Sequence, residues 1–254
     1  MNSKCIDVSE YQGFINWGKV KKSGIDYAII RVGGRYAISG EIFSDDSALD
    51  NISNALANNI KIGIYFFTEA INEAEAVEEA QWTLNKIKKY RDKISLPIYI
   101  DTEYYPAGRH NNLTKTQRTN VIKAFCKTIQ SAGYMAGLYA SISWLYEKLD
   151  MSLLSGYSVW VAQYYTECEY KGYYDIWQYS SVGTVDGING NVDMNYLYRD
   201  FQKEVEYSDD IKVKAVDVIL GKYGNNAERV EKLGKDYGKT QDLVNEIARR
   251  LSNE

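Results

Sequence analysis

The stretch "LPIYIDTEYY", residues 96–105, combines the pattern of a buried strand with a pair of acids. It is apolar up to Ile100, and Asp101 and Glu103 follow with one residue between them. Side chains two residues apart on a strand point to the same side, with Cα atoms about 6.5–7 Å apart. The stretch therefore predicts a buried strand whose end presents two carboxylates to one face.

Similar apolar runs of strand length recur before it and after it. They lie at residues 4–9, 27–32, 61–67, 96–101, 134–140, 158–164 and 175–180, and a last short one leads into 189–195. Helical patterns at 47–59, 72–90 and 114–133 separate several of these runs. Such alternation predicts parallel strands joined by crossover helices, and eight strands predict a barrel. Because the helices after the later strands look short or absent, we expect an α/β fold of the irregular, TIM-like (β/α) barrel type.

The pattern changes after Phe201, where no further strand is predicted. Apolar residues fall on three successive helical faces. The faces are Val213, Val216, Ile219 and Leu220, then Val230, Leu233 and Tyr237, then Leu243, Val244, Ile247 and Leu251. Gly221 and Gly238 stand at expected helix ends. We therefore expect a barrel domain at 1–203 and a small three-helix module at 208–254.

Composition excludes several kinds of site. His110 is the single histidine, so multi-histidine metal sites are impossible and any Ser-His-Asp or Cys-His arrangement would depend on it. It stands in the polar segment "PAGRHNNLT", which predicts a loop side chain in solvent. The glycine-rich segments lack the GK[ST] ending of a phosphate loop. We expect no metal and no cofactor.

Charge, cysteine content and hydropathy limit the kinds of binding partner and the cellular compartment that we expect for this protein. The net charge of −4 gives no reason to expect nucleic-acid binding. Cys5, Cys126 and Cys168 are too scattered for a disulfide frame and fit free thiols. No apolar run approaches the roughly 20 residues of a membrane span, and the first residues lack the apolar core of a signal peptide. We expect a protein made in the cytoplasm, without membrane insertion.

Two further acids should join Asp101 and Glu103. Asp7 follows the first predicted strand, and Asp193 lies near the last. In a (β/α) barrel the carboxyl ends of the strands form the active-site mouth, and the first and last strands are neighbours. We therefore expect all four carboxyl groups in one pocket.

Clustered acids suit three different roles. In glycoside hydrolysis one carboxyl group protonates the leaving oxygen while another manages the positive charge that develops on the sugar, and crowding raises the pKa of the acid. Grouped acids also bind magnesium, and a single aspartate at a strand end can simply cap a loop. The 23 tyrosines fit stacking against sugars but also fit ordinary strand packing.

Several motifs resemble those of the glycoside hydrolase family 25 lysozymes. They are "IDVSEYQGFINW" (6–17), "YIDTE" (99–103) and "NVDMN" (191–195), with "AIIRVGG", "GIYFF", "AGLYAS", "VWVAQY" and "IWQYSS" in order between them. The likeness covers about residues 4–201. It implies an irregular (β/α) barrel that cleaves the β-1,4 bond between N-acetylmuramic acid and N-acetylglucosamine in peptidoglycan.

The resemblance also implies roles for individual residues. Glu103 matches the general acid, and Asp101 matches the residue that steadies the substrate's N-acetyl group or acts as a base. Asp7 and Asp193 match the flanking acids. Positions that contact sugar are matched by Tyr65, Tyr139, Trp160, Gln163 and Gln178, with packing in the barrel core as the alternative for Tyr65 and Trp160.

The tail has a resemblance of its own. "VDVILGKYGNNAERVEKLGKD" and "VNEIARRL" are similar to the short cell-wall-binding repeat first known from a pneumococcal phage lysozyme. A single copy should bind weakly unless the chain forms a homo-oligomer through this module. The layout fits a phage endolysin made in an infected host cell and acting on the wall after release, with a bacterial autolysin as the alternative.

Two other functions stay open at this point. A non-catalytic peptidoglycan-binding protein would be favoured if Glu103 or Asp101 were replaced, and both acids are present. A chitinase-like glycosidase would carry a longer DxxDxDxE run, of which only the final D-x-E occurs here.

Overall fold

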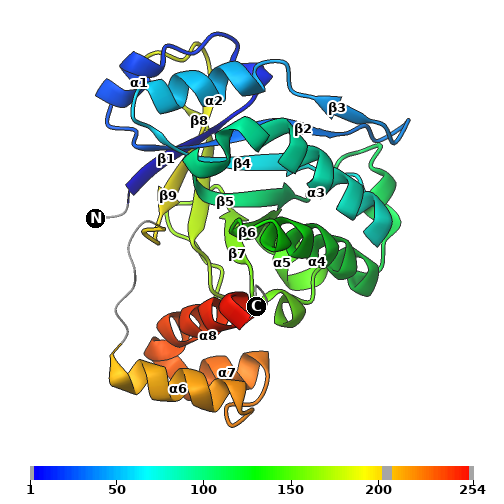
Figure 1. Cartoon of the computed structure of the whole chain (residues 1–254), viewed down its shortest axis with the longest axis vertical. Coiled ribbons are helices and arrows are strands. Elements are labelled where there is room, and N and C mark those ends of the chain that lie inside the picture. The colour runs from blue at the N-terminus through cyan, green and yellow to red at the C-terminus, as the bar shows by residue number, and fades with distance from the viewer. Residues whose placement is uncertain (1–2, 202–207, 252–254) are drawn as a thin grey trace.

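The computed structural model of the protein describes residues 3–201 and 208–251. Its strands form one sheet in the order β1-β9-β8-β7-β6-β5-β4-β2-β3, and β1 also pairs with β2, which closes eight strands into a barrel (Figure 1). The barrel strands are β1 (Ser3–Val8), β2 (Tyr27–Arg35), β4 (Lys61–Phe67), β5 (Ile94–Asp101), β6 (Ala136–Ser141), β7 (Ser158–Ala162), β8 (Ile176–Gly183) and β9 (Val192–Leu197). The predicted α/β barrel is confirmed.

The last strand departs from the expected parallel arrangement. β9 runs antiparallel to both β8 and β1, whereas the other barrel neighbours pair in parallel. The connection at residues 184–191 is too short for the crossover that a parallel return requires, so the chain turns back directly. Asp193 therefore reaches the mouth from the start of its strand, and not from the end.

The longer helices agree closely with the sequence patterns. They are α2 (Ala48–Ala57), α3 (Glu73–Ile87) and α4 (Lys115–Ser131), and the shorter ones are α1 (Trp17–Lys22) and α5 (Ile142–Glu147). Asn72 and Thr114 cap α3 and α4 by accepting main-chain hydrogen bonds through their side chains. The sequence patterns missed α1, α5 and the hairpin strand β3 (Ile42–Ser44), each of which has at most six residues.

Alternation along the strands divides the apolar core into two parts. Ile98 and Ile100 point outward to the helices, where they join the larger core cluster. Tyr99 points inward and packs with Ile29 and Trp160 inside the barrel. The barrel interior is therefore filled, and a cleft can form only at its mouth.

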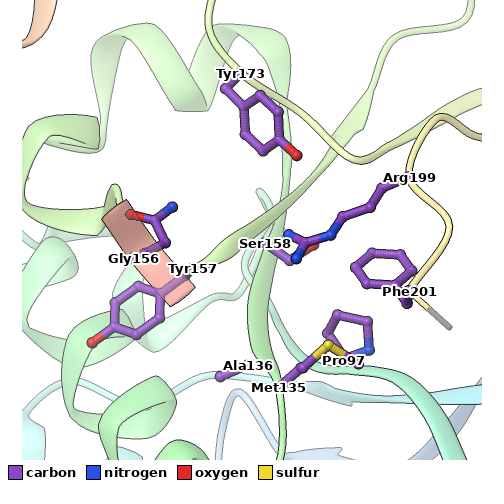
Figure 2. Close-up of a pocket in the computed structure, with 10 residues that line it drawn as sticks. Pro97, Met135, Ala136, Gly156, Tyr157, Ser158, Tyr173, Arg199 and Phe201 are labelled. Carbon is purple, nitrogen blue, oxygen red and sulfur yellow. The ribbon is translucent and has the colours of Figure 1, made fainter. Parts of the chain in front are cut away.

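The opposite end of the barrel is closed by a polar network around Asp175. The Asp175 carboxylate accepts hydrogen bonds from the Ser158 and Tyr173 hydroxyls, and the Arg199 guanidinium lies 3.9 Å away. Figure 2 shows the Tyr173 hydroxyl and the Arg199 side chain pointing toward Ser158, with Phe201 beside them. This buried aspartate thus has hydroxyl donors and a cation close by.

Three helices follow the barrel, as predicted: α6 (Asp209–Ile219), α7 (Asn226–Leu233) and α8 (Tyr237–Leu251). They form a separate layer beside the barrel, coloured orange to red in Figure 1. Gly238 lies against Tyr173, and Asp242 lies 3.6 Å from Arg199. The helical layer therefore packs on the closed end of the barrel, away from the mouth.

The predicted buried face of α6 is wrong. Val213, Val216, Ile219 and Leu220 are between 50% and 64% exposed. The residues that α6 buries are Ile211, Ala215 and Val218. Both sets fit a helical face, and the set containing the small Ala215 is the one that packs against α8.

The helix ends in the tail agree only in part with the prediction. Gly221 follows α6 with a φ of 78°, as expected for a residue that ends a helix. Gly238, however, lies inside α8, and Gly234 with a φ of 50° follows α7 instead. Leu251, expected on the third face, lies outside the residues whose side chains the structure describes. Within residues 3–201 and 208–251, no helix is both long and apolar enough to span a membrane.

Candidate active site

A cleft of about 650 Å³ opens at the mouth of the barrel. All of the predicted site residues except one line it: Asp7, Asp101, Glu103, Asp193, Tyr65, Tyr139, Trp160 and Gln178. The four acids come from three places far apart in the chain: β1, the end of β5 with the residues just after it, and β9. The barrel therefore gathers them as the strand pattern predicts.

Strand register explains how the acids meet. Asp7 on β1 lies directly opposite Asp193 on β9. Asp101 ends β5, where its main-chain carbonyl accepts a hydrogen bond from the Thr68 N–H at 3.0 Å. The Thr102 N–H in turn donates to the Tyr139 carbonyl at 3.0 Å. The main chain is thus anchored on both sides up to the residue before Glu103.

Neutral donors fix the Asp7 carboxyl group. Its Oδ2 accepts hydrogen bonds from Asn195 Nδ2 at 2.7 Å and from Gln178 Nε2 at 3.0 Å. Gln178 is itself held through its Oε1, which accepts from the Tyr139 hydroxyl at 2.8 Å and the Tyr164 hydroxyl at 3.0 Å. The chain of amides and hydroxyls orients Asp7 without supplying a countercharge.

Burial raises the pKa values of all four acids, and repulsion from neighbouring carboxylates adds to this for Asp7, Asp101 and Glu103. Burial, followed by the charge of Asp193, raises the pKa of Asp7 to about 8. Burial raises the pKa of Asp193 to about 6. The pKa of Glu103 is raised by burial and then by Asp193, and that of Asp101 is raised well above its usual value by burial and then by Glu103. The cleft therefore retains protons near neutral pH, as an acid catalyst requires.

Asp101 keeps an acceptor atom unused. Its side chain is 5% exposed, and within the described residues its Oδ1 has no hydrogen-bond partner. A buried acceptor without a donor costs free energy, so natural proteins seldom leave one unless it has a use. Because Asp101 lines the cleft, a ligand N–H can supply the missing donor.

Aromatic side chains form the floor of the cleft. Trp160 is 1% exposed, and its Nε1 donates to Asn195 Oδ1 at 2.7 Å. The rings of Tyr139 and Tyr65 meet it edge to face, with centroids 4.6 Å and 6.0 Å away. Trp160 and its neighbours thus belong to the barrel core and to the cleft at once.

Gln163 does not line the cleft, contrary to expectation. Its Nε2 donates to Glu169 Oε2 at 2.7 Å, and its Oε1 accepts from the Glu169 N–H at 2.8 Å. It stands just past the end of β7, where both ends of its amide are used to fold the following loop. The next residue, Tyr164, lines the cleft in its place.

Several residues of the cleft were not singled out from the sequence. Arg31 lines it and pairs with Asp45 at 2.8 Å and Glu10 at 3.1 Å, with its guanidinium 4.8 Å from the centre of the Tyr11 ring. Asn195 holds Asp7, as described above. The sequence did contain a signal for both residues, because Arg31 and Asn195 are polar residues that interrupt apolar runs of strand length.

His110 is not the solvated loop residue that the sequence predicts. It is 1% exposed, and its Nε2 lies 2.9 Å from the main-chain carbonyl of Glu103. The surrounding segment is polar because it folds over buried polar groups, a property that local composition does not reveal.

A metal site at the mouth requires acids converging on one point. In the part of the chain that the structure describes, no three His, Cys, Asp or Glu side chains converge closely enough to hold a metal ion.

Comparisons with known proteins agree with this architecture. The profile of glycosyl hydrolases family 25 matches residues 6–188, and that of the CW_7 repeat matches residues 214–248. Lysozyme M1 of Streptomyces globisporus is 30% identical over 203 residues, which are 75% of this chain and 66% of that protein. The autolytic lysozyme of Clostridium acetobutylicum is 24% identical over 197 residues, covering 76% of this chain and 55% of that protein. The chain thus spans two thirds or less of the length of these relatives.

Solved structures extend the likeness to the fold. The modular autolysin LytC of Streptococcus pneumoniae, solved in complex with a synthetic peptidoglycan ligand, is 32% identical with a TM-score of 0.69, covering 78% of this chain and 47% of that one. The CTP1L endolysin is 20% identical with a TM-score of 0.66 and covers 98% of this chain and 99% of that one. At that identity the second likeness concerns the fold alone, and it includes the tail.

Proposed function

The chain belongs to glycosyl hydrolases family 25, and we propose that it is a lysozyme that hydrolyses the β-1,4 bond between N-acetylmuramic acid and N-acetylglucosamine in bacterial peptidoglycan. The proposal rests on one observation, which is that four carboxyl groups lie in one cleft lined by aromatic side chains. Within the described residues none of the four forms an ion pair, and every one has a raised pKa. Acids kept partly protonated are what glycoside hydrolysis needs.

Glu103 is the proposed general acid. It is half-buried at the cleft, immediately beyond the anchored end of β5. The negative charge of Asp193 adds to burial in raising the pKa of Glu103, which favours the protonated form. Protonation of the glycosidic oxygen by such a residue typically contributes about 10²–10⁴-fold to the rate.

Asp101 is proposed to hold the substrate's acetamido group. Asp101 ends β5 and Glu103 follows it by only two residues, so the pair is not expected to stand across a sugar ring as acid and direct nucleophile. The substrate carries its own nucleophile in the 2-acetamido oxygen. Asp101 Oδ1, which has no donor among the described residues, would accept the acetamido N–H and direct that oxygen to the anomeric carbon. Cleavage would then retain the anomeric configuration.

Asp193 and Asp7 have different proposed tasks. Asp193, with a pKa of about 6, carries negative charge near neutral pH and would stabilise the positive charge on the sugar. Asp7, with a pKa of about 8, is mainly protonated there and would act as a neutral, oriented hydrogen-bonding group. This division follows from burial, since Asp7 is 5% exposed and Asp193 is half-buried.

The sugar-binding surface would combine the floor and the walls of the cleft. Tyr65, Tyr139, Trp160 and Gln178 form part of the floor. Tyr11, Tyr36 and Tyr105 line the walls and are 81%, 53% and 48% exposed, so a large part of each ring is accessible to sugars. A cleft open at its sides suits an internal bond of a long glycan strand.

The three-helix tail is proposed to keep the enzyme on the wall. We assign residues 1–203 to the catalytic barrel and residues 208–254 to a cell-wall-binding module, on the basis of the CW_7 match. With a single copy per chain, the module would bind weakly as a monomer and more strongly in a homo-oligomer. The proposed place of action is the bacterial cell wall.

Mass spectrometry of fragments released from purified peptidoglycan tests the proposal. New reducing ends on N-acetylmuramic acid are expected. Reducing ends on N-acetylglucosamine would assign a different bond, and binding without cleavage would favour a non-catalytic glycan-binding protein. NMR of the anomer first released tests the mechanism, because an initial β-anomer supports retention and an initial α-anomer excludes it.

A further inference from the structure

Three polar side chains are buried together beneath the segment that follows Glu103. Glu69, His110 and Arg118 are 0%, 1% and 2% exposed. Glu69 belongs to the connection between β4 and α3, His110 to a short turn at Arg109–Asn112, and Arg118 to α4. Burying ionisable groups is costly, so this triad of side chains needs an explanation.

Hydrogen bonds link the triad to the proposed acid. His110 Nε2 lies 2.9 Å from the main-chain carbonyl of Glu103. A carbonyl oxygen can only accept, so Nε2 carries the proton. Arg118 Nη2 donates to the His110 carbonyl at 2.6 Å, and the His110 main-chain N–H donates to Glu69 Oε2 at 3.4 Å.

The imidazole ring is held on its other sides as well. His110 Nδ1 faces Glu69 Oε2 at 3.2 Å, and the ring meets Trp144 on α5 edge to face at 5.5 Å. The Arg118 guanidinium lies over the same indole at 4.2 Å. Burial, followed by the charge of Arg118, lowers the pKa of His110 to about 4, so the ring is neutral near neutral pH. Burial raises the pKa of Glu69, and within the described residues Nδ1 itself makes no hydrogen bond.

The triad is poorly arranged for stability alone. Four atoms of this triad have no hydrogen-bond partner within the described residues: Glu69 Oε1, His110 Nδ1, and the Nε and Nη1 atoms of Arg118. Apolar side chains of the same volume would avoid these unmet bonds, and such replacements are often neutral or stabilising. A role in positioning accounts for polar groups that packing alone does not require.

The main chain of Glu103 has little other support. The β-ladder ends at Asp101, and Tyr104 and Tyr105 are exposed. The contact with His110 is the one hydrogen bond that the structure gives to the main chain of Glu103, as far as the described residues go. Without it, the nearest main-chain hydrogen bonds around Glu103 within the described residues would be those of the Thr102 N–H and of the Tyr105 carbonyl.

We propose that His110 is a positioning residue for Glu103, with Glu69 and Arg118 holding the main chain of the turn that carries it. The inference rests on the proposed function, since it needs Glu103 to be the acid. His110 itself does not line the cleft and cannot reach substrate. Its effect would pass through the position of the Glu103 main chain, where a displacement of about 1 Å can cost about 10²-fold in rate.

Three substitutions separate positioning from packing. His110→Gln can place an amide N–H near the position of Nε2 and so keep the donor. His110→Phe keeps the ring beside Trp144 but has no donor, and His110→Asn is too short to reach the Glu103 carbonyl. The values of kcat and KM on a soluble muropeptide are measured per folded molecule, alongside thermal unfolding.

We expect His110→Phe and His110→Asn to lose about 10–100-fold in kcat, with KM changed by less than about threefold. His110→Gln should recover most of kcat, even if it unfolds at a lower temperature than His110→Phe. Should one of the donor-less variants fail to fold, the other still gives the comparison with His110→Gln.

Equal kcat in all three variants and the wild type would overturn the positioning role while leaving the proposed function intact. So would a kcat that follows thermal stability, with Phe best and Gln no better than Asn. A wild-type chain that releases no fragments from peptidoglycan would overturn the proposed function and this inference together.

Discussion

The two ends of the barrel both bury aspartate, and they treat it in opposite ways. At the closed end, Asp175 is 0% exposed and lies among two hydroxyl donors and the Arg199 guanidinium. At the mouth, Asp7 has two amide donors but no cation, and one oxygen of Asp101 has no partner in the described chain. A buried acid with hydroxyl donors and a nearby cation supports the fold. A buried acid without a cation has a raised pKa, so it can hold a proton and is proposed to act on substrate.

The two ends of the barrel also differ in what they contribute to the stability of the fold. Hydrogen bonds to a charged group each contribute roughly 1.5–3 kcal/mol of stability, so the closed end holds the fold together. The crowded carboxyl groups at the mouth repel one another and raise each other's pKa. This repulsion lowers the stability of the folded protein. Substitutions at the two ends should therefore have different consequences.

The largest effect is expected from Glu103→Gln at the mouth. Glutamine fills the same space but cannot donate the proton, so kcat on peptidoglycan should fall by about 10²–10⁴-fold. Unfolding in urea should be unchanged or shifted to higher stability. Glu147→Gln on the exposed surface of α5 is the matched control and should leave both quantities unchanged. Near-normal lysis by a folded Glu103→Gln would remove the acid assignment.

Asp175→Ala at the closed end should show the reverse pattern. Two hydroxyl donors lose their acceptor and Arg199 loses a countercharge, which should lower the free energy of unfolding by about 3 kcal/mol. Activity per folded molecule should stay near normal, because the mouth lies at the other end of the barrel. Urea unfolding with a rate assay on the same samples measures both. A loss of kcat without a loss of stability would break the comparison.

Asp7→Asn should change the dependence of stability on pH. The pKa of Asp7 is raised to about 8, so the folded protein keeps a proton that the unfolded chain releases above its usual pKa of 3.8. The wild type therefore loses stability as pH rises through this window, and asparagine, which cannot ionise, should not. The advantage of the variant should be absent below about pH 4 and reach a few kcal/mol above pH 8, at about 1.4 kcal/mol per pKa unit. Thermal unfolding from pH 4 to 9 tests this, and a constant difference would contradict it.

Removing residues 206–254 should have the smallest effect on the chemistry. The tail packs on the closed end, so the truncated barrel should cleave soluble muropeptides at the normal rate and lose a little stability with the contact between Arg199 and Asp242. Lysis of intact walls should fall several-fold, because the tail is proposed to supply residence on the wall. Pelleting with purified walls measures binding. If the truncated chain binds walls as well as the full chain, the tail has another role, and assembly of the chain into oligomers through the tail is the first alternative to test.

Much of the candidate site was predictable from short segments. The "IDTE" stretch places Asp101 and Glu103 on one side of a strand end, and barrel closure brings Asp7 and Asp193 to them. For Asp7, Asp101 and Glu103 this needs only alternation along a strand and the rule that the carboxyl ends of parallel strands share a mouth. Asp193 reaches the same mouth from the start of the antiparallel strand β9. The supporting residues were harder to find, because Asn195 and Arg31 act through partners that are distant in sequence.

Sequence alone determined the features that depend on neighbouring residues. These are the strand runs, the capped starts of α3 and α4, the three helices of the tail and the presence of acids at strand ends. Each reflects propensity, periodicity or capping within a few positions, where physical preferences act whatever the rest of the chain does.

Tertiary structure alone decided which of several locally equivalent choices was taken. It set the antiparallel direction of β9 and the face of α6 that is buried. It directed the Gln163 side chain to Glu169 and away from the cleft. It also buried His110 beneath Glu103 and left one oxygen of Asp101, Oδ1, without a donor in the described part of the chain. Such outcomes depend on the length of a connection or on a partner many residues away, and the free energy of burial is settled only when the distant surfaces meet.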